Sequence, residues 1–347
     1  MKKILENKPV IMSAPCRLDF GGTLDISTFY FPLKRYSPST FNMAINMRTR
    51  VALFPYISGR VKISSRGFET AEFDAESLPL VHPMGLMFAI AAYFGASGVH
   101  IDIESSSPPR SALGGSSVAA VALISAFMRL RGRFSMDPPL DEIVLLAHHI
   151  ESSVARVPCG IQDQLAAAFG GVNQWHWTAD VAGLPYERNI LKEQDEYNEI
   201  NTHFVAAYCG NPHESKDING KWVEHFLNGT NIEVWKNIID CCNQFSEAIG
   251  MDDYILAAEL MRRETDYRLG MTPDVLDDVG IKLNELALEN DCGARFTGAG
   301  GGGCIWALGE KDKITALKSK WSEELVSHEN TTLLNVSIDG DGVRLEN

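Results

Sequence analysis

Residues 108–117 form a glycine- and serine-rich turn, PPRSALGGSS, that runs directly into the helical pattern VAAVALISAFMRLRGR. The pattern is apolar on nearly every side, so a helix over 116–131 must be buried in a core. A turn that opens such a helix leaves backbone N–H groups without partners, beside the positive end of the helix dipole. The sequence therefore predicts a core helix whose first turn can bind an anion such as phosphate.

The serines at the start of this helix have two alternative roles. Ser116 and Ser117 could be ordinary N-caps, or their hydroxyls could serve a phosphate or a hard cation. The segment alone does not decide between these roles. It is not the common phosphate loop, because no G-x-x-x-x-G-K-[ST] occurs and the Gly-Lys pair at 220–221 is followed by Trp222.

Length and composition are those of a globular protein of about two domains, with 347 residues, 45 % of them hydrophobic and 22 % charged. The net charge of −14 argues against broad binding to nucleic acid or to an anionic membrane. The longest apolar run, roughly residues 118–128, is too short to span a bilayer, and the N-terminus lacks a signal-peptide pattern. Seven scattered cysteines form neither a disulfide framework nor a CxxC pair, so we expect a reduced, cytoplasmic protein.

The order of short apolar runs and helical periods predicts an α+β fold in two lobes. The first sixty residues are expected to be rich in β-structure, with further strands at 61–74 and 99–105, followed by helices at 116–131, 139–155 and 161–169 and a strand at VNQWHW. A polar stretch at 186–202 is the predicted boundary between domains 1–195 and 196–347. Beyond it we expect a strand at 203–209, four helices between 218 and 290, a helix at 311–327, and late strands at ARFTG, CIWALG and TTLLNVSI.

The helix expected at 139–155 carries a carboxylate on its apolar face. Glu151 shares that face with Leu140, Ile143, Val144, Ala147, Ile150 and Val154. A carboxylate there needs a cation or hydrogen-bond donors close by if it is to stay ionised. A salt bridge and a magnesium ion are the two alternatives.

Two further segments place charged residues beside glycine turns. Asp163 falls in the first turn of the helix expected at 161–169, where it could simply compensate the helix dipole. Arg17 and Asp19 alternate along an early strand that leads to the pair Gly21-Gly22 and to Asp25. For Arg17 and Asp19, the alternative to a functional role is an ion pair at a strand end.

A third glycine-rich segment, TGAGGGGC at 297–304, fits G-x-G-x-x-G at Gly298, Gly300 and Gly303. It is not a dinucleotide-binding fingerprint, because only 44 residues follow Gly303 and a strand-like CIWALG comes next instead of a helix. Five glycines in six positions predict instead that backbone approaches a ligand very closely here.

Taken together, these segments resemble the three motifs of the GHMP kinase superfamily. The first motif is similar to residues 14–22, the second to 108–117 with Ala112 and Gly115 as departures, and the third to 297–304. The motifs occur in the family's order and are spread over most of the chain. The resemblance implies the two-lobed GHMP kinase fold, with an N-terminal lobe like ribosomal protein S5 and a ferredoxin-like α+β C-terminal lobe.

Within the superfamily, the segment GIQDQLAAAFGG at 160–171 resembles the sugar-1-kinase branch. It is most similar to D-glycero-D-manno-heptose 7-phosphate kinases, with fucokinases and galactokinases behind. The first motif departs from that branch, because the chain reads GGTLD at 21–25 without the extra glycine usual before Thr-Asp.

The resemblance implies a role for each site residue. Asp163 would accept the proton of the sugar hydroxyl, and Arg17 could stabilise either the ionised Asp163 or the charge on the transferring phosphoryl group. Ser116 and Glu151 would hold Mg²⁺ that bridges the ATP phosphates. The loop expected to wrap the phosphates comprises Pro109, Arg110, Ser111, Ala112, Leu113, Gly114, Gly115, Ser116 and Ser117. The residues expected at the sugar are Asp25, Gly22, Ala299, Gly300 and Gly301.

The sequence thus predicts an ATP- and Mg²⁺-dependent kinase, a monomer or homodimer, that phosphorylates the anomeric hydroxyl of a heptose 7-phosphate or related sugar. Three alternatives stay open: a fucokinase- or galactokinase-like kinase of an unphosphorylated sugar, a non-sugar kinase of mevalonate type, and a catalytically silent sugar sensor. Two assignments are weaker. Arg48 and Arg50 could face a substrate phosphate or merely lie on a strand, and NPHES at 211–215 could line the sugar pocket.

Overall fold

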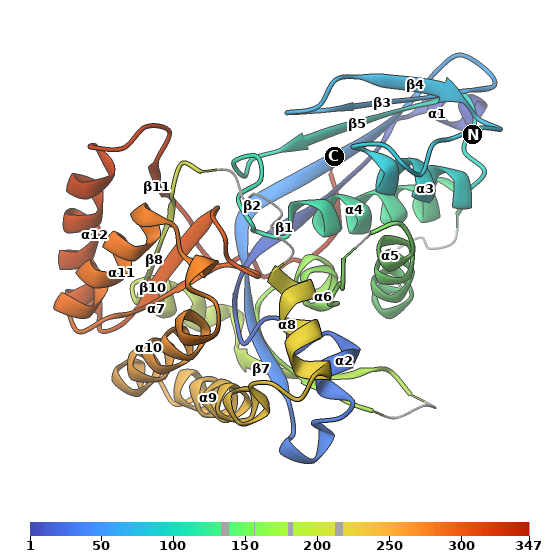
Figure 1. Cartoon of the computed structure of the whole chain (residues 1–347). Coiled ribbons are helices and arrows are strands. Elements are labelled where there is room, and N and C mark those ends of the chain that lie inside the picture. Colours follow the sequence, from blue (N-terminus) through green and yellow to red (C-terminus); the bar gives the residue numbers. More distant parts are fainter. Residues whose placement is uncertain (133–138, 156, 180–182, 212–217, 347) are drawn as a thin grey trace.

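The computed structural model describes residues 1–132, 139–155, 157–179, 183–211 and 218–346. These residues form two lobes that lie side by side, each built on its own β-sheet (Figure 1). The predicted α+β fold in two lobes is therefore confirmed. Within the described ranges, no helix is both long and apolar enough to cross a membrane.

In the described part of the chain, the larger lobe is built on an eight-stranded sheet whose main path is β12-β1-β2-β5-β3-β4. The strands are β1 (Val10–Phe20), β2 (Ser39–Pro55), β3 (Arg60–Ser65), β4 (Ala71–Asp74), β5 (Val99–Ser105), β6 (Val172–Trp177), β7 (Tyr186–Lys192) and β12 (Arg344–Leu345). The long strand β2 pairs with β1 along one edge, and with β5 and β6 in turn along the other. Only the β3–β5 pair is parallel among the strand pairs described.

Helices cover one face of this sheet. They are α3 (Gly85–Tyr93), α4 (Gly115–Leu130), α5 (Leu140–Val154) and α6 (Gln162–Phe169), while α1 (Lys2–Asn7), α2 (Ser27–Tyr30) and a 3₁₀ turn (Lys34–Tyr36) lie outside that layer. Helix α4 packs on β1 and β2 and is enclosed by α3, α5 and α6 (Figure 1). Every residue from Ser117 to Met128 is buried, which confirms the predicted core helix.

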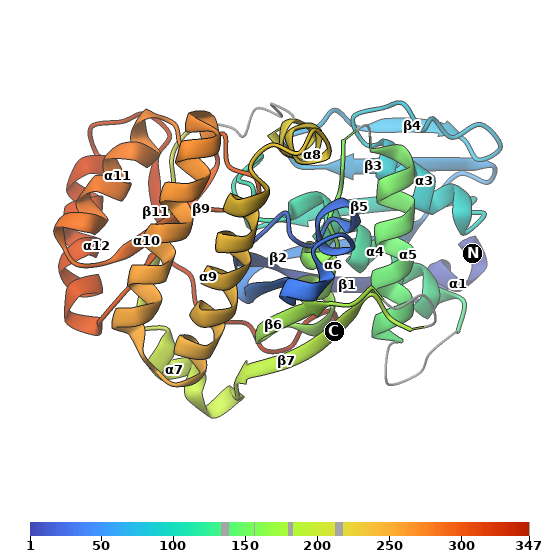
Figure 2. The ribbon, with the colours of Figure 1, turned by 60° about the horizontal axis from the view of Figure 1, so that its bottom comes forward.

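The smaller lobe has a four-stranded sheet in the order β11-β8-β10-β9 within the ranges described. Its strands are β8 (Phe204–Tyr208), β9 (Gly293–Phe296), β10 (Cys304–Leu308) and β11 (Thr332–Leu334), and its helices are α9 (Ile232–Gly250), α10 (Tyr254–Met271), α11 (Asp278–Glu289) and α12 (Lys311–Leu325). Helix α9 packs on α10 and also on β2 of the larger lobe, so it joins the two lobes (Figure 2). Helix α8 (Ile218–Leu227) packs on α2.

The chain passes between the sheets at 193–203, through a 3₁₀ turn (Gln194–Glu196) and α7 (Tyr197–Ile200), and its C-terminal segment then returns to the larger lobe. Strand β12 pairs with β1, and Ile338 forms a bridge with Ile45. Arg48 holds this returning segment by donating to the Asp339 carboxylate at 2.6 Å and to the Gly342 carbonyl. Arg48 is therefore a structural anchor, and Arg50 pairs with Glu104 at the surface.

Two parts of the fold differ from the sequence expectation. The polar stretch at 186–202 is not a simple connection, since its first seven residues form β7, whose side chains from Glu187 to Ile190 are exposed. An edge strand needs no alternating apolar face when both its sides meet solvent. Helix α3 was missed because GLMFAIAAY is apolar throughout and shows no helical period.

Candidate active site

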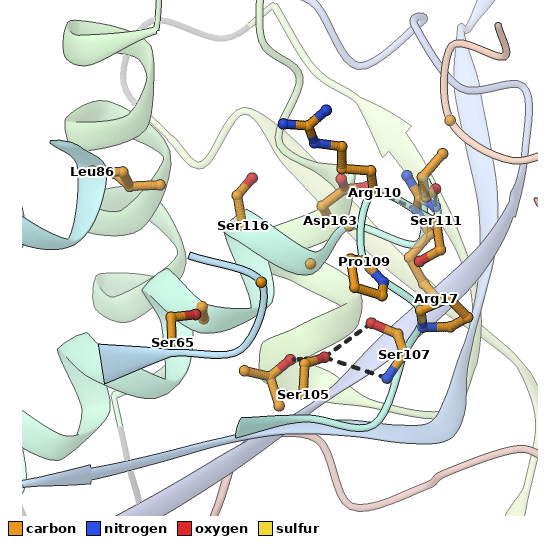
Figure 3. Close-up of a pocket in the computed structure, with 18 of the residues that line it drawn as sticks. Arg17, Ser65, Leu86, Ser105, Ser107, Pro109, Arg110, Ser111, Ser116 and Asp163 are labelled. Carbon is orange, nitrogen blue, oxygen red and sulfur yellow. Dashed lines mark hydrogen bonds and ion pairs between the residues drawn. The ribbon is translucent and has the colours of Figure 1, made fainter. Parts of the chain in front are cut away.

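A cavity of about 970 Å³ opens where residues of all three predicted motifs meet. Arg17 reaches it from β1, the loop before α4 forms one wall, and Asp163 reaches it from α6 (Figure 3). The predicted residues that line the cavity are Arg17, Asp25, Pro109, Arg110, Ser111, Ala112, Gly114, Gly115, Ser116, Asp163 and Ala299. Tertiary structure thus gathers segments far apart in the chain around one space.

The start of α4 has the geometry of an anion site. The helix begins at Gly115, and Gly114 is its N-cap with a φ of 83°. Ser116 and Ser117 therefore lie inside the first turn and make no capping hydrogen bond, so the N-cap alternative is wrong. The first N–H groups of the helix have no intrahelical acceptor, and Gly115 and Ser116 lie on the cavity wall.

The loop before α4 is held in an uncommon backbone conformation. Arg110 and Ala112 have φ values of 54° and 59°, in the left-handed region that non-glycine residues rarely adopt. Ala112 is a position at which the resembling motif carries glycine, which is the residue that this φ favours. Arg17 pins the loop to β1: Nη1 donates to the Ala112 carbonyl at 2.6 Å, and the Arg17 N–H donates to the Leu113 carbonyl at 3.3 Å.

Arg17 and Asp163 form a direct pair across the cavity floor, with Nε donating to Oδ1 at 2.8 Å. Arg17 is 3 % exposed and Asp163 is 23 % exposed, so the carboxylate can be reached from the cavity. Burial lowers the pKa of Arg17, but Asp163 and Asp19 outweigh burial and raise it above its ordinary value. The ion pair given as the alternative also forms, because Arg17 Nη1 lies 3.4 Å from Asp19 Oδ1. Arg17 thus pairs with Asp19 on its own strand and with Asp163 in the first turn of a distant helix.

The Glu151 carboxylate lies behind Ser116, at the edge of the same site. It accepts hydrogen bonds from Ser116 Oγ at 2.9 Å, Ser117 Oγ at 2.7 Å and Gln164 Nε2 at 2.7 Å. No cation pairs with Glu151 among the residues described, so the salt-bridge alternative is not formed there. Burial raises the pKa of Glu151, and the two serines offset only part of this effect.

The oxygens at this edge suit a hard cation. Glu151 and Ser116 supply carboxylate and hydroxyl oxygens, which Mg²⁺ prefers, and Gln164 Oε1 is buried without a hydrogen-bond partner. In the described part of the chain, no cluster of three or more His, Cys, Asp or Glu side chains could hold a metal by itself. The residues fit an ion that takes its other ligands from nucleotide phosphates, as Mg²⁺ does in many kinases.

The other end of the cavity floor is lined by Asp25, Thr23, Gln162 and Asn219. Asp25 is 5 % exposed, and one of its oxygens accepts a hydrogen bond from the Gln162 N–H at 3.0 Å. Gly160 makes room for this carboxylate, because a Cβ at position 160 would overlap it. Burial raises the pKa of Asp25 to about 6. Gln162 Oε1 is buried and has no partner, so this end presents unused hydrogen-bonding capacity.

Six predicted site residues do not line the cavity. Ser117 and Glu151 lie one contact behind it, and Leu113 is fully buried in the core. Gly22 packs against Asp19 and Gln162. Gly300 and Gly301 pack against the 3₁₀ turn (Pro273–Val275), where the Gly301 N–H donates to the Val275 carbonyl at 2.9 Å. Of NPHES at 211–215, the last four residues lie outside the described ranges, and Asn211 donates to Asp277 at 3.0 Å.

Sequence reasoning missed the apolar end of the cavity. It is lined by Phe68, Met84, Leu86, Met87 and Ile103, and Figure 3 shows Leu86 across the cavity from Arg110 and Asp163. These side chains come from the β3–β4 turn, α3 and β5, so no single motif contains them. Three hydroxyls that also line the cavity are linked to one another, Thr49 to Ser105 at 3.0 Å and Ser105 to Ser107 at 2.9 Å.

Known proteins match this chain over both lobes. The GHMP kinases N terminal domain matches residues 83–171, which include the loop before α4, Glu151 and Asp163. The GHMP kinases C terminal domain matches residues 252–327, which include the glycine-rich loop at 297–304. The two domains occur in the order that the sequence motifs predicted.

Individual relatives include kinases of two substrate types. Mevalonate kinase of Thermococcus sibiricus is 24 % identical over 97 % of this chain and 98 % of that protein. The D-glycero-alpha-D-manno-heptose 7-phosphate kinase of Campylobacter jejuni is 24 % identical over 86 % of this chain and 89 % of that protein. The crystal structure of a D-glycero-D-manno-heptose 1-phosphate kinase from Bacteriodes thetaiotaomicron superposes with a TM-score of 0.74, at 20 % identity, over 97 % of this chain and 99 % of that chain.

The two domain matches, and superposition along nearly the whole chain, confirm the predicted family and fold. GHMP kinases use ATP as their phosphate donor. This chain therefore belongs to the GHMP kinase superfamily and is a phosphotransferase that acts on an alcohol acceptor.

Proposed function

We propose that this kinase transfers the γ-phosphate of ATP to a sugar, at the anomeric hydroxyl of a heptose 7-phosphate or a related sugar. One observation carries the proposal: the Asp163 carboxylate, paired with Arg17 at 2.8 Å, lies directly beside Gly114 at the start of α4. A proton acceptor and an anion-binding helix terminus therefore adjoin in one cavity, with Asp25 on the acceptor side.

The cavity suggests how ATP would lie. The phosphates would bind the N–H groups at the start of α4 and the loop at 109–117. The adenine would extend to the apolar end, against Phe68, Leu86, Met87 and Ile103, since apolar walls with few polar groups are typical of such pockets. This orientation leaves the γ-phosphate beside Asp163 and the acceptor between Asp163 and Asp25.

In this arrangement the chemistry is a direct in-line transfer. The oxygen of the acceptor hydroxyl attacks the γ-phosphorus while Asp163 accepts the proton of that hydroxyl. The bond from phosphorus to the β–γ bridging oxygen breaks, and ADP leaves. Arg17 stabilises charge on the transferring group and holds Asp163 in place. Mg²⁺ held by Ser116 and Glu151 would neutralise charge on the phosphate oxygens. No covalent enzyme intermediate is needed, so positioning accounts for most of the acceleration.

The acceptor end favours a polyhydroxylated substrate over a mevalonate-type acid. Asp25, Thr23, Gln162 and Asn219 offer a carboxylate, a hydroxyl and two carboxamides, all of which hydrogen-bond sugar hydroxyls. Like charges on Asp25 and Asp163 disfavour an anionic group at this end of the cavity, so the 7-phosphate of a heptose would have to lie away from both carboxylates. The heptose 7-phosphate kinase relative supports a sugar as the acceptor, whereas the mevalonate kinase relatives support a mevalonate-type acceptor as the second candidate.

The test is a panel of acceptors supplied with MgATP to the purified protein. The panel contains galactose, fucose, mannose, D-glycero-D-manno-heptose, its 7-phosphate, and mevalonate, with ADP release as readout and ³¹P NMR to locate the new phosphate. We expect turnover of the heptose 7-phosphate with an anomeric phosphate as product. Turnover of mevalonate alone would replace the sugar proposal by the mevalonate type. ATP binding without any turnover would support a sugar sensor.

A further inference from the structure

A buried network of ion pairs joins the smaller lobe to the site, and the proposed chemistry does not use it. At its centre is Glu264 on α10, which is 0 % exposed. Its Oε1 accepts a hydrogen bond from Arg268 Nε at 2.8 Å, and its Oε2 accepts one from Arg295 Nε at 2.9 Å. Both arginines are also fully buried, so three charged side chains out of reach of water depend on one another.

One arm of the network runs from Glu264 toward the candidate base. Arg295 on β9 donates from Nη1 to Asp19 Oδ2 at 3.1 Å. The other Asp19 oxygen accepts from the Gly298 N–H at 2.7 Å and lies 3.4 Å from Arg17 Nη1. Alternating charges therefore connect Glu264 to the arginine that pairs with the base, and the same arm fixes the start of the glycine-rich loop.

The second arm runs from Glu264 to the acceptor side of the cavity. Arg268 donates from Nη2 to the Gly22 carbonyl at 2.6 Å and from Nη1 to Thr23 Oγ1 at 3.5 Å. Both belong to the acceptor loop, residues 21–25, which carries the Asp25 carboxylate. The loop is thus held from the smaller lobe by one guanidinium group.

Aromatic packing fixes that guanidinium group. It lies against the rings of Trp222 on α8 and Trp235 on α9, 4.6 Å and 4.7 Å from their centroids. Cation–π contacts of this kind are stronger where water is excluded. Arg268 therefore has one available position, defined by two rings, the Glu264 carboxylate and the acceptor loop.

Stability is a weak explanation for such a network. Desolvation of buried ions offsets much of their mutual attraction, and well-packed apolar residues often replace such groups without loss. Burial raises the pKa of Glu264, but Arg295 and Arg268 outweigh burial and lower it, so the carboxylate is held in its charged form. Charged partners with fixed hydrogen-bond directions do specify geometry, which apolar packing does less strictly.

We propose that Glu264 is a positioning residue: through Arg295 and Asp19 it orients Arg17 toward Asp163, and through Arg268 it holds the acceptor loop. The inference rests on the proposed roles of Asp163 and Asp25. It assigns different kinetic consequences to the two arms. The Arg295 arm determines the rate of the chemical step, and the Arg268 arm determines acceptor affinity.

The test uses three variants of the full chain with MgATP and the acceptor that the wild type turns over fastest. Glu264→Gln keeps the shape of the side chain and removes its charge, and Arg268→Met and Arg295→Met each remove one arm. Activity is expressed per bound ATP analogue, so that a reduced folded fraction does not imitate a lower kcat. A wild type that turns over no acceptor would refute the proposed function, whereas an active wild type with unaffected variants would refute this inference alone.

We expect a split between kcat and KM. Arg295→Met should lower kcat roughly ten- to hundredfold with little change in acceptor KM, because a small misplacement of Arg17 and Asp163 is costly. Arg268→Met should raise acceptor KM about tenfold with a smaller effect on kcat. Glu264→Gln should show both effects, and the KM for ATP should stay unchanged in all three.

Lys192→Met is the matched control. Lys192 is a buried cation held by Glu196 at 3.1 Å and Asp252 at 2.7 Å, outside this network, so its loss should lower thermal stability and leave both kinetic parameters unchanged. Equal changes in both arms, a parallel loss of ATP affinity, or wild-type kinetics in Glu264→Gln would overturn the inference. If the methionine variants do not fold, Arg268→Lys provides the test, again by comparing kcat with acceptor KM. Lysine keeps the positive charge but lacks the guanidinium group that bonds Glu264 and Gly22 together.

Discussion

The carboxylate of Asp163 packs directly against Gly114, so that a Cβ at position 114 would lie 3.1 Å from Asp163 Cγ. Gly114 is also the N-cap of α4, with a φ of 83° that disfavours other residues. Space and backbone conformation therefore both favour glycine at this position. The missing side chain allows the proposed proton acceptor to lie beside the helix terminus that is proposed to bind the ATP phosphates.

Gly114→Ala should change both kcat, through the added Cβ, and stability, through the left-handed φ. We expect kcat to fall roughly tenfold, because the new Cβ moves the Asp163 carboxylate by a few tenths of an ångström from the helix terminus, and the left-handed φ should lower stability by roughly 1 kcal/mol. Steady-state kinetics and thermal unfolding measure the two effects. Gly250→Ala is the control, since a Cβ there meets no atom within 4 Å and its φ is unremarkable. Wild-type kcat in Gly114→Ala would contradict the close approach.

Asp163→Asn should abolish the proton acceptor without removing the shape of the side chain. We expect kcat to fall by roughly 10²–10⁴, the usual contribution of a general base, while the affinity for ATP is retained. Kinetics with the best acceptor and titration with an ATP analogue provide the measurements. Asp312→Asn is a matched control, because Asp312 is likewise an acid in the first turn of a helix, α12, but is exposed and far from the cavity. Near-normal turnover of Asp163→Asn would remove Asp163 from the catalytic role.

Glu151→Gln should weaken the binding of Mg²⁺ at the start of α4. We expect the Mg²⁺ concentration for half-maximal activity to rise roughly tenfold or more, measured with total ATP held constant while Mg²⁺ is varied. Burial raises the pKa of Glu151, so its ionised form lowers stability at neutral pH, and the neutral glutamine should raise the melting temperature of the metal-free protein. An unchanged Mg²⁺ dependence would show that Glu151 only orders Ser116 and Ser117.

Asp25 predicts a pH dependence of stability with a definite sign. Burial raises its pKa in the folded state to about 6, from an ordinary value of 3.8. The folded protein then binds the proton more tightly than the unfolded chain, so the contribution of Asp25 to the free energy of unfolding falls as pH rises through this interval. Asp25→Asn, which cannot ionise, should gain roughly 3 kcal/mol of stability relative to wild type between about pH 4 and pH 7.5. Urea unfolding at both pH values tests this, and a constant difference would contradict it.

Local patterns were sufficient for most elements and for singling out Glu151, whereas the catalytic candidates Arg17 and Asp163 depended on the resemblance to a known family. The apolar period of α4 and the stripe on α5 follow from side-chain spacing, which does not depend on distant contacts. Glu151 was singled out because a carboxylate on an apolar face needs partners, and its partners are Ser116 and Ser117. Helix α3 and strand β7 were not predicted, since one is apolar throughout and the other is an exposed edge strand.

The glycine-rich loop at 297–304 shows where local reasoning stops. Its composition predicts close backbone approach, and such approach occurs at Gly300 and Gly301, where the neighbour is Val275. Glycine content predicts that the backbone can approach another group closely, but which group this is depends on how another segment packs against the loop.

Residue types and their spacing predicted the phosphate-loop candidate before α4 and the buried carboxylate of Glu151, and the resemblance of three motifs to the GHMP kinases predicted the family and the residues proposed for the reaction. Only the tertiary structure decided that Arg17 pairs with Asp163, that the apolar end of the cavity is built from the β3–β4 turn, α3 and β5, and that Glu264 connects both arms of a buried network. The physical reason is the separation along the chain over which each interaction acts. Periodicity and turn chemistry act between residues a few positions apart, whereas ion pairs and cavity walls join residues that become neighbours only when the two lobes pack together.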